Sequence, residues 1–308
     1  MNIIGPDSLV FGVDDVQACH TFLTDYGLTP VNVDESGGHY EALDGTSFEI
    51  RQRDDQRLPA ALSTGSTLRK TLYGVASAED LAAIAEELGK DRGVKKLDDG
   101  SLECKDDMGF VLGFQITVRR PIEARQESTN TPGASVQRDT NDLGVRLDEK
   151  ISPLTLSHVV YFVPDVPKAE AFYTERLGFR CTDRLVGAGP FLQPPAQDDH
   201  HTLFLIQTPD FMQGIDHCTF HFAGPTTAIR RGYELVEKGY ESFWGPGRHI
   251  MGSNWFWYFN SPLGCKVELD ADMDKHDSQW QPREVPISKD ASQAFLLSYT
   301  EKWMPGGK

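Results

Sequence analysis

An internal repeat constrains the fold more than any other feature, because both halves of the 308-residue chain carry the same order of local patterns. In the first half, the apolar run at residues 9–13 is followed by Asp15. In the second half, the run at 158–163 is followed by Asp165. Each aspartate is a good helix N-cap, and an amphipathic stripe of apolar residues comes after it. Such self-similarity predicts structural copies of one supersecondary unit.

The predicted unit is a strand, a helix and three further strands, and it occurs twice in each half. Gly27 and Gly178 stop the first helix of each half, as glycines past a helix C-terminus commonly do. A second helix is predicted in each half, at 78–88 and at 225–238. The chain is therefore expected to be an α+β protein built from tandem βαβββ modules.

The domain boundaries follow from one stretch with little hydrophobic periodicity, residues 119–152, whose Ser, Thr, Pro and Gly residues indicate a linker. We predict a first pair of modules at 1–118, the linker at 119–152, a second pair at 153–275 and a tail at 276–308. The tail is expected to pack on the body or on a neighbouring subunit through its large apolar residues: Trp280, Phe295, Leu296, Tyr299 and Trp303.

Composition narrows the classes of partner. Hydrophobic residues make up 39% and charged residues 25%, as in a soluble globular protein. No apolar run approaches the roughly 20 residues that span a bilayer, and no secretory signal is evident. The five cysteines are odd in number and far apart, which favours reduced thiols in the cytoplasm. A net charge of −16 repels phosphate, so neither nucleic acid nor a membrane is an expected partner.

Two histidines and one carboxylate are the candidate metal ligands. His158 and His217 each open a strand-like run, and Glu268 ends the segment 261–268. Two imidazoles and one carboxylate from separate strands can occupy one face of an octahedral ion and leave the opposite face open, which suits a non-haem Fe(II) centre that activates O₂. Taken singly, each residue is equally compatible with an ordinary polar position on a half-exposed strand. Their combination favours the metal site.

Strand alternation groups further residues around these ligands. His221 shares a face with His217 but lies about 13 Å along the strand, at roughly 3.3 Å per residue, so it is expected to be structural or at a rim. Tyr258 and Glu268 are equidistant from Leu263 in a predicted turn. In a regular hairpin they project from the same face, near a common site. An ordinary strand aromatic is the alternative for Tyr258.

The residues before Glu268 resemble the signature of type I extradiol ring-cleavage dioxygenases, a family of the vicinal oxygen chelate (glyoxalase/bleomycin resistance/dioxygenase) superfamily. That signature is roughly Gly-x-His, five to seven residues, an apolar residue, Tyr, two residues, a small polar or acidic residue, Pro, x, Gly, two or three residues, Glu. Trp257 and Ser261 depart from the usual residue types. The resemblance covers most of the chain and implies tandem βαβββ modules that form two barrel-like domains. The chain reads Gly247-Arg-His249, seven residues, Trp257-Tyr258, two residues, Ser261-Pro262-Leu-Gly264, three residues, Glu268.

The resemblance implies a role for each candidate residue. His158, His217 and Glu268 would hold Fe(II), with Mn(II) possible because it accepts the same ligand set. His249 and Tyr258 would face a catechol-type substrate, whose ring is cleaved with O₂ to a muconic semialdehyde-type product. The other expected partner is a further copy of the chain, in a homo-oligomer.

An acid–base histidine shortly before the second metal ligand is also implied. The segment Asp198-Asp-His-His-Thr202 supplies two candidates, His200 and His201. We favour His201 and keep both, since the loop to His217 is slightly longer than the resemblance predicts. A polar surface loop is the alternative for this pair. Three other histidines have no such context and are expected at the surface: His20, His39 and His276.

Two other functions on the same fold stay open from the sequence. One is a metal-dependent isomerase or lyase of the glyoxalase type, which usually recruits ligands from both modules, whereas all three candidates here come from one half. The other is a non-enzymatic small-molecule-binding protein, which is typically about half this length and lacks the His-His-Glu set.

The repeat also predicts that the first half holds no metal. Serine and glycine cannot replace the ligand set, and a lysine ammonium repels a divalent cation. We therefore expect one metal per chain, held by residues after 150. Aligning the helix caps, the strand ends and the turn glycines of the two halves gives three pairs: Ser8 with His158, Lys70 with His217 and Gly113 with Glu268.

Overall fold

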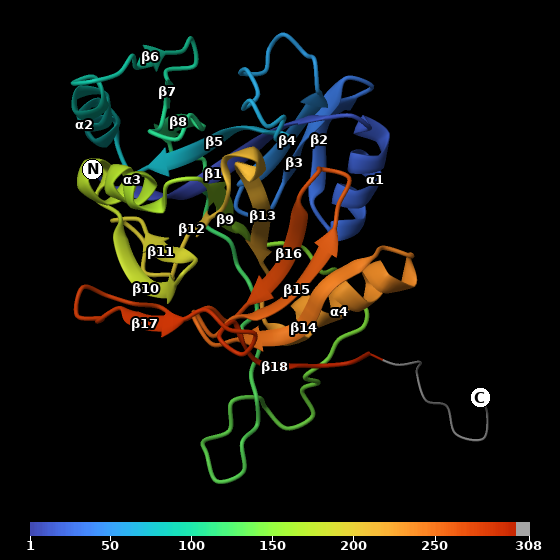
Figure 1. Cartoon of the computed structure of the whole chain (residues 1–308). Helices are drawn as coiled ribbons and strands as arrows, with labels where there is room; N and C mark the ends of the chain where they lie inside the picture. The colour runs from blue at the N-terminus through green and yellow to red at the C-terminus, as the bar shows by residue number, and fades with distance from the viewer. Residues whose placement is uncertain (300–308) are drawn as a thin grey trace.

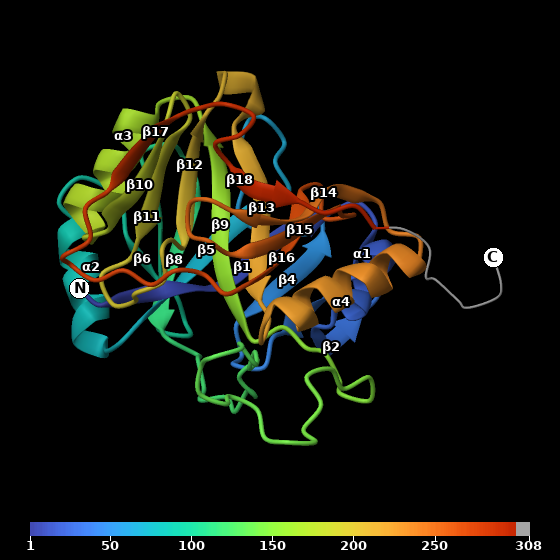
Figure 2. The same ribbon diagram turned by 90° about the horizontal axis from the view of Figure 1, so that it is seen from below.

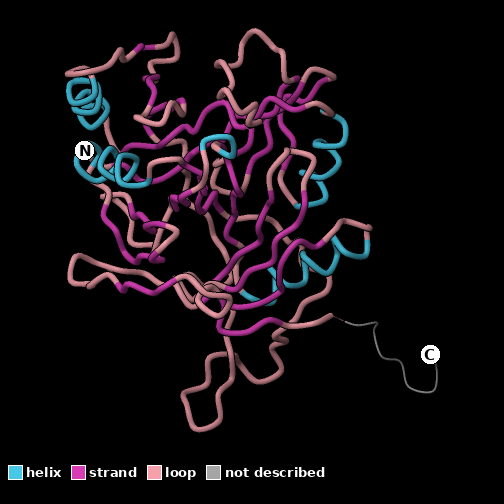
Figure 3. The backbone as a smooth tube through the Cα atoms, in the orientation of Figure 1, coloured by secondary structure: helices cyan, strands magenta, loops and turns pink. Residues whose placement is uncertain are grey.

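The computed structural model describes residues 1–299, in which strands form the centre and helices lie at the outside (Figures 1 and 3). The first half contains β1 (Ile3–Val13), α1 (Val16–Tyr26), β2 (Thr29–Asp34), β3 (Gly37–Glu41), β4 (Ser47–Gln52), β5 (Leu68–Val75), α2 (Ala78–Leu88), β6 (Lys95–Lys96), β7 (Leu102–Lys105) and β8 (Val111–Ile116). No helix of residues 1–299 has the length and apolar character that crossing a membrane requires.

The second half repeats this order and adds two strands at its end. Its elements are β9 (Thr155–Val163), α3 (Val166–Ala171), the π-helix η1 (Phe172–Arg176), β10 (Arg180–Val186), β11 (Gly189–Gln193), β12 (Leu203–Gln207), the 3-10 helix η2 (Asp210–Met212), β13 (Gly214–His221), α4 (Pro225–Glu237), β14 (Ser242–His249), β15 (Trp255–Asn260), β16 (Lys266–Ala271), β17 (Arg283–Pro286) and β18 (Gln293–Leu296).

Each half forms one sheet, and each sheet joins two βαβββ modules through their first strands. The eight-stranded sheet has the order β2-β3-β4-β1-β5-β8-β7-β6, with β1 antiparallel to β5. The ten-stranded sheet has the order β17-β10-β11-β12-β9-β13-β16-β15-β14-β18, with β9 antiparallel to β13. The predicted tandem modules are therefore confirmed in both halves.

Local signals explain where the first helices begin and end. The Asp15 carboxylate accepts a hydrogen bond from Ala18 N at 2.8 Å, and Asp165 accepts one from Lys168 N at 3.0 Å. Gly27 caps α1 with φ 111°, a conformation that glycine adopts at little cost. The second-half helix differs from the prediction, because its α-helical part ends at Ala171 and continues as a π-helical turn.

The two sheets share one apolar core, and the side of β13 that faces away from the ligands joins it. Phe220 of β13 packs on Phe48 of β4, with ring centroids 4.8 Å apart. Tyr26 of α1 also contacts Phe220 and donates a hydrogen bond to the Glu268 carbonyl oxygen at 2.6 Å. The first half thus supports the strand that carries a candidate ligand. In both views α1 lies near α4 and α2 near α3, so helices pair across the halves (Figures 1 and 2).

The segment predicted as a linker contains no helix or strand, and the green loop in Figure 1 extends well away from the sheets. The tail packs on the body of the chain, because β17 pairs with β10 and β18 pairs with β14, at the two edges of the ten-stranded sheet. Trp303, which we expected to take part in this packing, lies outside the described residues.

Candidate metal centre

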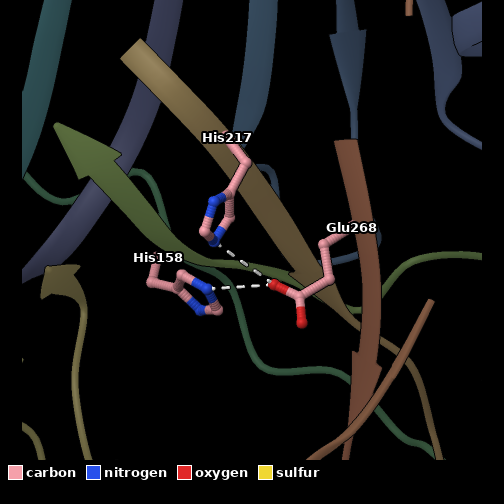
Figure 4. Close-up of side chains that lie close together, drawn as sticks. All are labelled: His158, His217 and Glu268. Atoms are coloured by element: carbon pink, nitrogen blue, oxygen red, sulfur yellow. Dashed lines mark ion pairs between the residues drawn. The ribbon is translucent and has the colours of Figure 1, made fainter. Parts of the chain in front are cut away.

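Three neighbouring strands bring the candidate ligands together. Thr219 of β13 stands opposite His158 of β9 on one side and opposite Glu268 of β16 on the other. His217 lies two residues before Thr219 and so shares its face. One ligand atom from each of His158, His217 and Glu268 lies within 4.8 Å of the other two, and all three residues are buried (Figure 4). Each of these ligands lies within its strand, whereas the sequence suggested that the histidines begin theirs.

Hydrogen bonds turn the same nitrogen of both histidines toward Glu268. Nδ1 of His158 lies 2.9 Å from Ser157 Oγ, and Nδ1 of His217 lies 2.7 Å from Asp216 Oδ2. The two Nε2 atoms are 3.1 Å and 3.7 Å from Glu268 Oε2. A carboxylate that holds one ring nitrogen of a histidine fixes the tautomer that offers the other nitrogen to a metal. Asp216 therefore orients His217.

Glu268 is fully buried, and one of its oxygens lacks a hydrogen bond. Thr219 Oγ1 donates to Oε2 at 2.6 Å, whereas Oε1 accepts none among the described residues. Burial alone would raise the pKa of Glu268, but the neighbouring His158 and His249 hold it well below its usual value. His249 Nε2 lies 3.4 Å from Oε1, while Oε2 faces the Nε2 atoms of both candidate histidine ligands. A buried carboxylate needs a balancing charge. A divalent cation bound between Oε2 and these two nitrogens would supply it, so the donor set fits a metal.

Tyr258 and His249 form a second layer beside the three candidate ligands. Tyr258 stands opposite Glu268 in the β15–β16 hairpin, as the turn around Leu263 predicted. Its hydroxyl lies 3.3 Å from His249 Nε2, and its ring centroid is 5.0 Å from that of His217. Burial first, then the nearby Glu268 carboxylate, raise the pKa of Tyr258 well above its usual value. Tyr258 therefore keeps its proton and acts as a hydrogen-bond donor.

The structure separates His200 from His201. The His201 ring faces the cavity described below and lies 4.4 Å from the His158 ring, centroid to centroid. Burial, followed by the neighbouring His158, lowers the pKa of His201 well below its usual value. His200 lies behind it, with Nδ1 of the two rings 2.9 Å apart. His201 is thus the member of the pair that a bound molecule would touch.

The remaining histidines lie outside this cluster. His221 is held by Asp270 at 2.6 Å and by Asp199 at 3.4 Å, and these carboxylates, which outweigh the effect of burial, raise its pKa to about 10. His276 is half-buried and stacks on Trp280, with centroids 3.8 Å apart. Half-buried positions were also found for the two others, His20 and His39.

Sequence reasoning missed the residues that hold the ligands. Asp216 and Ser157 each directly precede a candidate ligand, and that adjacency to a histidine was the available signal. Thr219, two residues after His217 and therefore on the same face of the strand, was given no role. Asp183 and Arg283, which contact each other behind His200, lie 100 residues apart and left no local signal.

The ligands open into a cavity of about 280 Å³ inside the ten-stranded sheet. The first module of this half contributes mostly apolar side chains besides His158 and His201, and the second module contributes most of the polar ones. The tail closes part of it, because Ser292 accepts a hydrogen bond from His249 Nδ1 at 2.7 Å. Apolar lining residues are Val160, Leu185, Ala188, Phe191, Phe204, Ile206, Phe243, Met251, Ile287 and Ala291.

The first half has the same register but none of the ligands. Leu72 of β5 stands opposite Ser8 of β1 and opposite Gly113 of β8, as Thr219 stands opposite His158 and Glu268. Lys70, two residues before Leu72, takes the place of His217 and pairs with Glu103 at 3.3 Å. A Cβ on Gly113 would lie 2.4 Å from Leu72, so leucine occupies this space. The three aligned pairs are therefore confirmed by strand pairing: Ser8 with His158, Lys70 with His217 and Gly113 with Glu268.

Comparison with proteins of known sequence identifies relatives. The model of the Glyoxalase/Bleomycin resistance protein/Dioxygenase superfamily matches residues 155–269. Metapyrocatechase 2 of Cupriavidus necator is 35% identical over 126 residues, which cover 41% of this chain and 39% of that protein. Biphenyl-2,3-diol 1,2-dioxygenase of Paraburkholderia xenovorans (strain LB400) is 26% identical over 283 residues, 88% of each chain. The match thus spans about two fifths of the first relative and most of the second.

Solved structures share the whole fold. The Mn(II)-bound glyoxalase from Novosphingobium aromaticivorans has a TM-score of 0.74 at 20% identity, covering 99% of this chain and 97% of its own. The halotolerant catechol dioxygenase BphC has a TM-score of 0.73 at 14% identity, covering 96% and 94%. Residues 155–269 thus match the Glyoxalase/Bleomycin resistance protein/Dioxygenase superfamily, and over nearly its whole length the chain has the two-domain fold of these solved structures.

Proposed function

We propose that the protein is an extradiol dioxygenase that cleaves the ring of a catechol with O₂ at a non-haem Fe(II) centre held by His158, His217 and Glu268. The observation that carries this proposal is the buried His-His-Glu cluster, in which two Nε2 atoms converge on Glu268 Oε2 and which opens into a largely apolar cavity. Bound Fe(II) would supply one chemistry, the joint activation of a catechol, through its vicinal oxygens, and O₂. Mn(II) is the alternative metal.

Residues of the chain would position the substrate and move its protons. His201 faces the cavity and, with its lowered pKa, is neutral near pH 7, so it accepts a proton from a catechol hydroxyl and returns it later. Tyr258, which keeps its proton, donates a hydrogen bond to a substrate oxygen next to Glu268. His249 is tied to Ser292 through Nδ1 and presents Nε2 to Tyr258 or to the substrate.

The cavity supports a catechol with an uncharged, apolar substituent. The two charged side chains that line it apart from the ligand cluster are Lys266 and Asp216, and they pair with each other. Lys266 is therefore not free to receive a substrate carboxylate. The opposite wall is apolar, with Phe191 and Phe204 stacked at a centroid distance of 4.0 Å. A buried carboxylate without a partner would weaken binding by roughly 10- to 100-fold.

The alternative functions find less support in the site. A glyoxalase-type isomerase or lyase that takes ligands from both halves would need donors near Ser8, Lys70 and Gly113, and these positions offer none. A non-enzymatic binder does not account for a buried cluster of ligands beside two further histidines. We also place the protein in the cytoplasm, in keeping with five cysteines that form no disulfide, and expect a homo-oligomer.

The test is metal analysis of anaerobically purified protein, followed by a colour assay with a catechol panel. We expect about one iron per chain and a yellow ring-cleavage product from alkyl- and aryl-substituted catechols, with much lower kcat/KM for carboxylated ones. Glu268→Gln serves as the control that removes a ligand. Bound metal without ring cleavage of any catechol, together with isomerase activity on a thiol adduct of a 2-oxoaldehyde, would overturn the proposal in favour of the glyoxalase type.

A further inference from the structure

A buried chain of three side chains leads away from the cavity behind His201. Nδ1 of His201 lies 2.9 Å from Nδ1 of His200, and Nε2 of His200 lies 2.9 Å from Oδ2 of Asp183. Relative exposures are 5% for His201 and 0% for both His200 and Asp183. Because water does not reach this chain, its hydrogen bonds determine where the protons lie.

Asp183 is ionised and accepts hydrogen bonds only. The backbone N–H of Arg283 in β17 donates to Oδ1 at 2.8 Å, and Nε of the same residue lies 3.1 Å and 3.0 Å from the two carboxylate oxygens. Burial alone would raise the pKa of Asp183, but hydrogen bonds from His200 and Arg283 hold it well below its usual value. The guanidinium already balances the carboxylate charge, so a second cation on His200 would be buried without compensation.

The donors and acceptors in this chain then determine the tautomer of both histidine rings. Since Asp183 has no proton, His200 must donate to it from Nε2. A neutral imidazole carries one proton, so His200 Nδ1 is an acceptor. His201 must therefore carry its proton on Nδ1 and donate it to His200. Nε2 of His201 is left with a lone pair, and it accepts no hydrogen bond from residues 1–299, while its ring lines the cavity.

We infer that His200 is a positioning residue that holds His201 in the Nδ1–H tautomer, so that Nε2 faces the cavity as a base. This inference rests on the proposed function only for the use of that base in ring cleavage. A proton that leaves a catechol hydroxyl would bind Nε2 of His201. The positive charge that then forms stays on the His201 ring, whose Nδ1–H continues to donate to His200, and it is lost when the proton returns to the product.

The first test measures the tautomer of His201 directly and does not depend on enzymatic turnover. Histidine ¹⁵N chemical shifts of the metal-free protein are expected to show the proton on Nδ1 of His201 in the wild type. In His200→Leu, which keeps no acceptor, we expect a mixture of tautomers. His200→Gln is expected to restore the wild-type pattern in part, because its amide can donate to Asp183 and accept from His201. A wild-type His201 protonated on Nε2 would overturn the inference.

The second test is kinetic and uses the iron-loaded protein. For His200→Leu we expect kcat to fall by roughly 10- to 100-fold, the usual effect of losing a residue that orients a site group, with iron content and the KM for catechol little changed. His276→Ala is the matched control, since its ring lies 5.4 Å from that of His200 but outside the chain of hydrogen bonds. An equal loss of kcat in His276→Ala, or none in His200→Leu, would contradict the inference.

Two further outcomes are distinguishable. If His200→Leu does not fold, Asp183→Asn removes the charge that orders the protons, and we expect the same loss of tautomer preference in the ¹⁵N spectrum. An unchanged spectrum in that variant would count against the inference. If the wild type cleaves no catechol, the proposed function fails, and the spectrum still decides whether His200 sets the tautomer.

Discussion

Asp106→Asn should remove a pH-dependent loss of stability at the contact between the two halves. Asp106 lies in the turn between β7 and β8, where Oδ1 accepts hydrogen bonds from Met108 N and Phe110 N, both at 2.9 Å. Oδ2 accepts one from the hydroxyl of Tyr173, in the second half, at 3.1 Å. Burial is the main cause that raises the pKa of Asp106 from 3.8 to about 6, and these hydrogen bonds offset it only in part.

The sign of the effect follows from the raised pKa. The fold favours the protonated form, so the stabilisation is fully present below the unfolded-state value of 3.8 and is lost as the pH rises through about 6. A pKa unit corresponds to about 1.4 kcal/mol, so the full loss is about 3 kcal/mol. Asparagine stays neutral at every pH. Part of this loss has already occurred at pH 4, where the unfolded carboxyl is more than half ionised, so the free energy of unfolding of Asp106→Asn, relative to the wild type, should increase by about 2.4 kcal/mol between pH 4 and pH 7.

Urea unfolding of the metal-free protein, measured at several pH values, gives this difference. Asp107→Asn is the matched control, one residue along the same turn. Asp107 pairs with Arg92 at 2.8 Å near the surface, and such pairs contribute less than about 1 kcal/mol. If the difference between Asp106→Asn and the wild type stays within about 0.5 kcal/mol from pH 4 to pH 7, the buried carboxylate does not titrate as argued.

The other predictions concern the metal centre. Glu268→Gln should leave the circular dichroism spectrum unchanged and lower iron content to near zero; full iron occupancy would remove Glu268 from the ligand set. Asp216→Asn should weaken metal binding by roughly 10- to 100-fold, measured by competition with a chelator, and an unchanged affinity would mean that Asp216 does not orient His217. The Tyr258→Phe variant should keep its iron but turn over more slowly than the wild type. A turnover rate equal to that of the wild type would contradict a role for the Tyr258 hydroxyl. Elemental analysis should find one tightly bound metal per chain, and a second would contradict the division between the halves.

Local patterns predicted the architecture well. The repeated aspartate caps gave the βαβββ order, and the helix at 78–88 was found with those bounds. Symmetry about Leu263 placed Tyr258 opposite Glu268, because a two-residue side-chain period fixes which positions share a face. The aromatic run of β15 alternates between the two faces of the strand, since Trp257 is buried in the core while Tyr258 lines the cavity.

Local sequence patterns could not predict the contacts between distant segments. The tail supplies Arg283 to Asp183 and Ser292 to His249, yet Arg283 begins the short strand β17 and Ser292 directly precedes the short strand β18, both in polar surroundings. No periodicity or motif at Arg283 or Ser292 indicates which residue it contacts. The π-helical turn after Ala171 was missed for a related reason, because the apolar stripe is compatible with an α-helix and the change in hydrogen bonding leaves no residue signature.

The comparison of the two halves shows how one backbone brings together a candidate ligand set in one copy and none in the other. In the second half the central position of the register is Thr219, whose short hydroxyl donates to Glu268 and leaves room above it. In the first half the same position is Leu72, which fills the space over Gly113. Restoring the ligands at Ser8, Lys70 and Gly113 alone would leave Leu72 only 2.4 Å from the new Cβ at position 113, so we expect that a second site would also need a small residue in place of Leu72.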